Sequence, residues 1–133
     1  MLKVKTRIGT SKIHGTGLFA DEFIPKGTIT WQYNPQFDIS ISTNDMDSLN
    51  SVNRDYYKYY CYFDKKRDVF ILCSDNQRFI NHTEDKSQEN ILSTPDQDVS
   101  LRDISIGEEL LCDYNKFDSE YFERMNIGKD KLL

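Results

Sequence analysis

Apolar and polar residues alternate over short stretches, and turn residues interrupt these stretches at close intervals along most of the chain. An alternation with a period of two is typical of strands that bury one face. Turn signals at residues 64–67 and at Pro95-Asp96 predict that the strands around them form two hairpins. The predicted strands, in chain order, are residues 2–6, 28–33, 58–63, 68–73, 90–94, 97–101 and 109–112.

Residues 43–57 have helical spacing instead. Met46, Leu49 and Val52 recur every three residues and fall on one face of a helix. Thr43 is a candidate N-cap, and acidic residues in the first turn favour the helix dipole. We therefore predict one helix in this region.

A second helix is predicted near the end of the chain. Its apolar residues follow helical spacing, and they are Phe117, Tyr121, Phe122 and Met125. Asp118 or Ser119 can cap its first turn, and Gly128 can end it. Many short strands with two short helices predict a fold class that is mainly β with short helices.

The composition indicates one folded domain. The chain has 133 residues, enough for one core, and 13% of them are aromatic, which argues against disorder. No apolar run approaches the roughly 20 residues that span a bilayer. Charged residues follow Met1 closely, where a signal peptide would be apolar. We therefore expect a soluble, intracellular protein of the cytoplasm or nucleus, with no membrane partner.

The spacing of cysteine and histidine predicts no metal site. Cys61, Cys73 and Cys112 are scattered, and neither His14 nor His82 has a second histidine three to five residues away. Structural zinc sites use such short spacings. Three scattered cysteines suit buried thiols in a reducing compartment.

The charge distribution restricts the class of partner. A net charge of −5 weighs against a generic DNA or RNA binder, whose affinity depends on neutralising phosphates. Acidic groups outnumber basic groups in residues 78–133. This excess either attracts a basic partner or only keeps the protein soluble, and the charge alone leaves both explanations open.

Three polar clusters interrupt the strand-and-turn pattern. Residues 11–20 contain a Gly-x-Gly, which either forms a turn or lets the backbone approach a ligand closely. In residues 78–82, Arg-Phe-Ile-Asn-His, the apolar pair would draw Asn and His out of water, into an internal network or a site. Residues 107–114 place Tyr114 at the end of a short strand, as a core tyrosine or a functional phenol.

In their order and spacing these clusters resemble the SET-domain protein lysine methyltransferases. The first is similar to the Gly-x-Gly loop of that family, the second to its Arg-Phe-Ile-Asn-His motif, and the third to its Gly-Glu-Glu-Leu followed by Asp-Tyr. The resemblance spans roughly residues 5–115. It implies a β-clip-like SET fold in which the segment ending at Tyr114 passes beneath the loop of the second motif, as a C-terminal pseudoknot.

The resemblance also implies a division of the chain. Residues 1–115 would be the SET domain, with residues 43–57 as its variable insert, and residues 116–133 would be a C-terminal helical extension. The sequence contains no Cys-rich, zinc-binding flank of the kind seen in many family members. The aromatic residues of the extension would therefore close the lysine channel, or alternatively only pack on the sheet.

S-adenosylmethionine is the cofactor that the resemblance implies, and the acceptor of its methyl group would be a lysine of a basic peptide or protein, such as a histone tail. Tyr114 would be the catalytic tyrosine, and Tyr33 would help to line the lysine channel. A second copy of the chain can complete a channel wall as a homodimer. The residues expected to contact the cofactor are Lys12, His14, Gly15, Thr16, Gly17, Arg78, Phe79, Asn81, His82, Tyr114 and Phe117.

These residue types suit methyl transfer to an amine. A free lysine has a pKa of about 10.4, so deprotonating it at pH 7 costs roughly 4.6 kcal/mol. A narrow aromatic channel disfavours the ammonium, and the positive sulfonium acts in the same direction. A carboxylate beside the amine would instead hold the proton on it. The family can therefore use a phenol and backbone carbonyls in place of an Asp or Glu base.

Two departures from the family pattern leave other hypotheses open. Asn34-Pro35 follows Tyr33 where the family often has Gly-Glu, and residues 83–89 form a longer, acidic link. The chain is therefore either a methyltransferase or a SET-like binding module that has lost catalysis. An acidic all-β interaction domain unrelated to methylation is the third hypothesis.

Overall fold

The computed structural model describes residues 1–125, which form three small sheets and three short helices. Strands β1 to β10 are Thr6–Thr10, Thr16–Ala20, Ile29–Gln32, Ile39–Ile41, Tyr62–Asp64, Val69–Leu72, Asn81–His82, Ile91–Ser93, Gln97–Ser100 and Leu111–Cys112. Helices α1, α2 and α3 are Thr43–Ser48, Ser51–Tyr60 and Tyr121–Met125, and the 3₁₀ turns η1 and η2 are Asn76–Phe79 and Tyr114–Lys116. The predicted fold class is confirmed. The helix end predicted at Gly128 lies outside the described residues.

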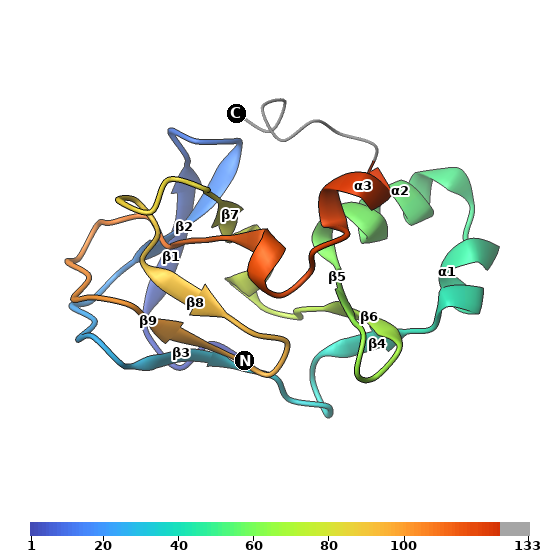
Figure 1. The fold of residues 1–133 in the computed structure, drawn as a ribbon, viewed down its shortest axis with the longest axis horizontal. Coiled ribbons are helices and arrows are strands. Elements are labelled where there is room, and N and C mark those ends of the chain that lie inside the picture. Colours follow the sequence, from blue (N-terminus) through green and yellow to red (C-terminus); the bar gives the residue numbers. More distant parts are fainter. Residues whose placement is uncertain (126–133) are drawn as a thin grey trace.

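The sheets are arranged so that the C-terminal segment crosses the middle of the molecule (Figure 1). The five-stranded sheet has the order β3-β9-β8-β10-β7, and the smaller sheets are β1-β2 and β4-β6-β5. Both predicted hairpins are confirmed, because β5 pairs with β6 and β8 pairs with β9, each antiparallel. Helices α1 and α2 lie beside the three-stranded sheet, away from β1 and β2.

Strand β10 enters the five-stranded sheet between two earlier strands. It runs parallel to both neighbours, with Cys112 opposite His82 of β7 and opposite Ile91 of β8. The loop that joins β7 to β8 therefore passes around β10. This is the threaded crossing that the resemblance implied, and it delivers Tyr114 beside residues 81–82.

Some predicted element boundaries are wrong. Residues 58–60 belong to α2, because the Asn50 side chain caps a second helix by accepting a hydrogen bond from the Asn53 N–H. Tyr57 and Tyr60 then pack on the core cluster around Met46. The first strand begins at Thr6 rather than at residue 2, since pairing across the Gly-x-Gly hairpin stabilises β1 while Leu2 makes only an isolated bridge.

All three cysteines are buried, as expected. Burial raises the pKa of the Cys61 thiol to about 12, and it also raises the pKa values of Cys73 and Cys112 well above normal. The thiols are therefore protonated at neutral pH and act as small apolar core groups.

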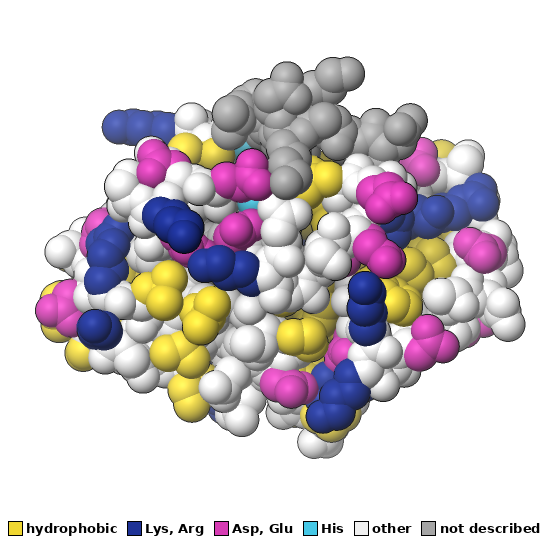
Figure 2. Space-filling model, viewed as in Figure 1, with side chains coloured by type: hydrophobic (Ala, Val, Ile, Leu, Met, Phe, Trp, Pro, Cys, Tyr) yellow, Lys and Arg dark blue, Asp and Glu magenta, His cyan; other side chains and the backbone are white. Residues whose placement is uncertain are grey.

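Figure 2 shows how charge is distributed on the face seen in Figure 1. Acidic side chains on this face are interspersed with Lys and Arg rather than gathered into one patch. Apolar side chains collect over β8 and β9, where Leu92 is 38% exposed. Within residues 1–125, no helix combines the length and the apolar character needed to cross a membrane.

Asn90 fastens the crossing strand to the sheet. Its side chain, only 1% exposed, donates to the Glu109 carbonyl and accepts from the Leu111 N–H, both at 2.8 Å. We expect Asn90→Ala to lower the free energy of unfolding by about 2–3 kcal/mol, because two buried backbone groups lose their partners. Urea denaturation measures this change. The exposed Asn44→Ala is the control, with an expected change within about 0.5 kcal/mol, and equal effects of the two variants would contradict the role of Asn90.

Candidate functional site

A cleft of about 320 Å³ lies where the three sequence clusters converge. It is lined by His14, Gly15, Thr16, Tyr59, Tyr60, Arg78, Phe79, Ile80, Asn81, Tyr114 and Tyr121. The Gly-x-Gly loop, the second motif and the crossing segment each contribute residues that the sequence singled out. Among the other predicted contacts, His82 lines a small adjoining cavity, Phe117 lines a different cavity, and Lys12 is exposed.

Asn81 connects the second motif to the Gly-x-Gly loop. Its Nδ2 donates to the carbonyl oxygens of His14 at 2.8 Å and Thr16 at 3.1 Å, and to Glu109 Oε2 at 3.0 Å. Gly15 has a φ of +50°, a left-handed conformation that favours glycine. The Asn81 amide therefore fixes the loop backbone, and the space beside Gly15 is open.

Glu109 supports the loop from behind, a role that sequence reasoning missed. Its two carboxylate oxygens each accept from Ser11 Oγ at 2.8 Å. A Cβ added at Gly17 would lie 2.5 Å from Glu109 Oε2, so only glycine lets the carboxylate approach the loop this closely. The second Glu of the third motif thereby places a negative charge next to the cleft.

Tyr114 occupies the point where the crossing segment leaves the sheet. Its hydroxyl donates to the Ile80 carbonyl at 2.5 Å, and its N–H donates to His82 Nδ1 at 3.0 Å. Its ring is surrounded by other aromatic rings, including Phe117 and Tyr121. Burial raises the pKa of Tyr114 well above normal, so the phenol is neutral and serves as a hydrogen-bonding group rather than a base.

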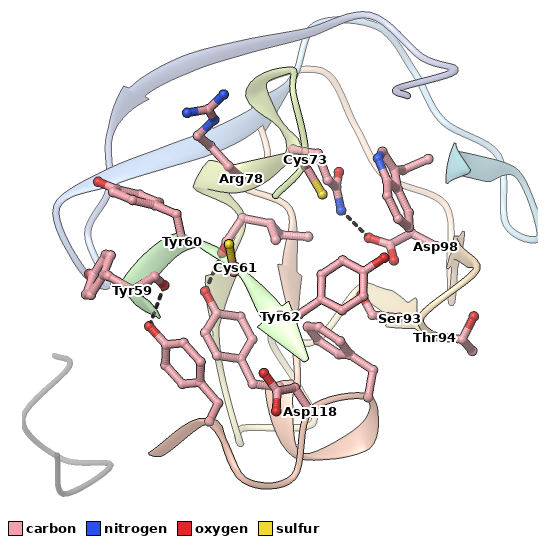
Figure 3. A pocket seen from close by; sticks show the side chains of 16 residues that line it. Tyr59, Tyr60, Cys61, Tyr62, Cys73, Arg78, Ser93, Thr94, Asp98 and Asp118 are labelled. Carbon is pink, nitrogen blue, oxygen red and sulfur yellow. Dashed lines mark hydrogen bonds between the residues drawn. The ribbon is translucent and has the colours of Figure 1, made fainter. Parts of the chain in front are cut away.

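A second, narrow cavity of about 50 Å³ adjoins the cleft (Figure 3). The two share Tyr59, Tyr60, Arg78, Ile80, Tyr114 and Tyr121. The remaining walls of the narrow cavity are Trp31, Cys61, Tyr62, Cys73, Gln77, Ser93, Thr94, Asp98, Phe117 and Asp118. A polar cleft and a narrow aromatic cavity that meet at Tyr114 and three other tyrosines can hold two different molecules with their ends close together.

The C-terminal end of α2 supplies site residues that the sequence prediction missed. Tyr59 Oη lies 2.6 Å from His14 Nε2, and the Tyr59 carbonyl accepts from the Tyr121 hydroxyl at 2.8 Å. The Arg78 guanidinium donates to the Tyr56 hydroxyl at 3.0 Å. These contacts tie α2 to both the Gly-x-Gly loop and α3. The sequence signal for them is the run of tyrosines in residues 56–60, part of which has strand propensity.

Tyr33 is not among the residues that line either cavity. The Arg67 guanidinium lies 4.3 Å from its ring centroid, and its hydroxyl is 3.4 Å from Ser40 Oγ. Tyr62 is the tyrosine that lines the narrow cavity instead, with its hydroxyl donating to the Pro95 carbonyl at 2.8 Å. The structure thus does not bring Tyr33 together with Tyr114.

His82, Glu84 and Asp113 offer potential metal-ligand atoms within 4.8 Å of one another. His82 Nδ1 already accepts from the Tyr114 N–H, and Asp113 Oδ1 accepts from the Asn115 N–H at 3.0 Å. These hydrogen bonds hold the residues after β10 in place, and they give His82 and Asp113 a structural role.

The threaded crossing and the Gly-x-Gly loop held by Asn81 agree with the SET fold that the sequence motifs implied. The family model described as SET domain matches residues 15–115. The chain therefore belongs to the SET-domain family, as the sequence motifs indicated. The comparison with curated proteins found no match.

Solved structures similar to this chain include those of polycomb repressive complex 2. The active complex in its basal state matches with a TM-score of 0.64 and 24% identity, over 97% of this chain and 16% of the other. A complex in an autoinhibited conformation bound to S-adenosylmethionine matches with a TM-score of 0.65 and 21% identity, over 95% and 17%. An inhibitor-bound humanized mutant from Chaetomium thermophilum gives 0.65 and 21%, over 93% and 17%. The chain thus spans about one sixth of these longer chains, and the likeness is one of fold.

Proposed function

We propose that this protein transfers a methyl group from S-adenosylmethionine to the side-chain amine of a lysine in a protein substrate. The observation that carries the proposal is that Tyr114 lines both the polar cleft and the narrow aromatic cavity. A cleft of about 320 Å³ is within the size range of small-molecule sites. Membership of the SET-domain family supports the proposal, as does a fold match whose structure is bound to S-adenosylmethionine.

The residues of the cleft fit this cofactor. S-adenosylmethionine would supply an electrophilic methyl group on a positively charged sulfur. The backbone of residues 14–16, fixed by Asn81, offers polar groups to an amino-acid moiety, and Phe79 offers an apolar ring surface to an adenine. The tyrosine rings at the end of α2 and the nearby Glu109 carboxylate favour a cation in the cleft.

The narrow cavity fits a lysine side chain, whose apolar stem can lie between aromatic rings. Trp31, Tyr62 and Phe117 form such walls, and they shield the amine from bulk water, which disfavours its ammonium form. Because the Tyr114 O–H donates to the Ile80 carbonyl, the phenol lone pairs can accept a hydrogen bond from the amine N–H. The neutral phenol would thereby orient the nitrogen toward the methyl group without holding a proton on it. A basic peptide or protein remains the expected substrate.

Two measurements on the full chain test this function. Calorimetric titration with S-adenosylhomocysteine, the product cofactor, is expected to show micromolar binding. Incubation with methyl-labelled S-adenosylmethionine and purified core histones, used as a lysine-rich probe, is expected to label protein at lysine. No binding by the folded protein would contradict the proposal. Binding with no label on histones or on a digest of whole-cell protein would instead identify a SET-like binding module.

A further inference from the structure

The narrow cavity contains a buried carboxylate that the proposed mechanism does not use. Asp98, on β9, is 2% exposed and lines this cavity. Its Oδ2 accepts from Gln77 Nε2 at 2.5 Å, and Ser93 also hydrogen-bonds to it. Among the salt bridges of residues 1–125, none includes Asp98. A buried carboxylate without a cation is costly, so its presence in a substrate cavity calls for a functional explanation.

The same cavity also contains a hydrogen-bond donor without a protein partner. Trp31 is 1% exposed, and within the described part of the chain its Nε1 has no partner. Buried polar groups that lack protein partners are commonly bonded to ordered water. A cavity of about 50 Å³ has room for one or two water molecules. Indole N–H, carboxylate and hydroxyl groups around it give such water several partners.

Asp98 lies away from the end of the narrow cavity that is shared with the cleft. Figure 3 shows Asp98 at one end of the narrow cavity and Tyr59 at the other, with Tyr62 between them. Tyr59 lines both cavities, whereas Asp98 lines only the narrow one. The carboxylate therefore does not lie beside the reacting amine, where it would hold the ammonium, but it can exchange a proton with that amine through water.

We propose that Asp98 accepts, through water in the narrow cavity, the proton that the target lysine must lose before methyl transfer. This inference rests on the proposed function. The ammonium gives one proton to the carboxylate, which leaves a neutral amine with a free electron pair and a neutral carboxylic acid. The amine then forms the N–C bond, and the electron pair of the broken S–C bond stays on sulfur. The methylated nitrogen carries the positive charge, and Asp98 releases its proton to solvent.

The surroundings of Asp98 suit a group that gains and loses a proton near neutral pH. Burial raises its pKa to about 7, while hydrogen bonds from Ser93 and Gln77 and the charge of the N-terminal amino group oppose the increase. The thiols of Cys73 and Cys112 face the same region and are neutral, because burial raises their pKa values. Asp38 and Asp75 also act on the Cys73 thiol, and Glu89 and Asp113 act on the Cys112 thiol. Arg78 and Asp118 are the other charged residues among those that line the narrow cavity.

The test compares the pH profiles of kcat/KM for the wild type, Asp98→Asn and Ser100→Ala. Asn keeps the shape of Asp but cannot accept the proton. At pH 7 we expect Asp98→Asn to retain less than about a tenth of the wild-type kcat/KM, with the two converging at about pH 11, above the lysine pKa of about 10.4, where the free amine is largely deprotonated. Ser100→Ala, a buried position on β9 that lines neither cavity, should keep the wild-type profile.

The Asp98→Asn variant is expected to fold. A carboxyl whose pKa is raised in the native state keeps its proton while the unfolded chain has lost it, so native stability falls as pH rises from about 4 to about 7. Asn removes this loss, and the melting temperature at pH 8 should be no lower than that of the wild type. Asp98→Leu, which also removes the acid but packs differently, should show the same pH profile as Asp98→Asn.

Two outcomes would overturn the proposal and can be told apart from failure of the proposed function. In the first outcome, the wild type is active and both Asp98→Asn and Asp98→Leu keep its pH profile of kcat/KM. Asp98 would then be only structural. If the wild type transfers no methyl group, the proposed function fails. Infrared spectra of the complex with S-adenosylhomocysteine test proton transfer to Asp98 without the need for turnover. Addition of a lysine peptide at pH 8 should increase a protonated-carboxyl band, and Asp98→Asn should lack this band. No increase would overturn the role of Asp98.

Discussion

Tyr114→Phe should lower kcat about 10²–10³-fold while changing the affinity for S-adenosylhomocysteine by less than about threefold. The substitution removes one hydroxyl and keeps the ring that packs among Phe117 and Tyr121. The hydroxyl donates to the Ile80 carbonyl at 2.5 Å, which leaves its lone pairs able to accept from the amine of the proposed substrate. Removal of one positioned hydrogen-bonding group at a reacting centre typically costs this much in rate.

Single-turnover kinetics with saturating cofactor and calorimetric titration of the same preparation separate the two effects. Tyr57→Phe is the matched control, because Tyr57 also belongs to the aromatic region of the fold but lines neither cavity. It should keep both rate and affinity. Wild-type turnover in Tyr114→Phe would exclude the phenol from the reaction. A large loss of cofactor affinity would mean that the hydroxyl shapes the cleft rather than orients the amine.

The sequence predicted those parts of the site that lie within single motifs. Asn81 and Tyr114 come from contiguous clusters, and strand β10 brings them together by entering the sheet beside β7. The hairpins were also predictable, because β5-β6 and β8-β9 each depend on residues adjacent in sequence. The threading itself came only from the family resemblance, since no local pattern indicates which earlier strands a late strand will separate.

The missed residues are those whose role depends on packing between distant elements. Tyr59 and Tyr62 lie in a run rich in aromatic residues, which have high strand propensity, but the Asn50 cap and packing on Met46 continue the helix through residue 60. Aromatic residues on a helix end and on the following strand then form opposite walls of one cavity. Their identity alone does not distinguish wall residues from core residues.

Asp98 was missed because its strand reverses the usual relation between polarity and burial. In β8 and β9 the polar residues Ser93, Asp98 and Ser100 are buried, while Leu92 is partly exposed. An alternating strand is normally interpreted with its apolar residues inward. Of these buried polar residues, Ser93 and Asp98 line the narrow cavity, which is consistent with a site at this end of the two strands.

Asn81→Ala should raise the dissociation constant for S-adenosylhomocysteine by at least about 100-fold. The Asn81 amide donates to the carbonyls of His14 and Thr16 and to the Glu109 carboxylate. Without it three acceptors each lose one hydrogen bond, and the Gly-x-Gly loop is no longer tied to β7 by this side chain. Because the proposed cofactor contacts on this side would come from the loop backbone, binding would then include the cost of ordering the loop.

Calorimetric titration at low temperature measures this affinity, with circular dichroism as a check on folding. Asn90→Ala is the informative control, because Asn90 flanks β10 on its other side and lines neither cavity. We expect that variant to be less stable but to bind with nearly wild-type affinity while folded. If both asparagine variants lose affinity in proportion to their loss of stability, Asn81 acts through the fold. If Asn81→Ala alone loses affinity, the amide organises the cofactor cleft. Unchanged affinity in a folded Asn81→Ala would show that the cofactor does not depend on this loop.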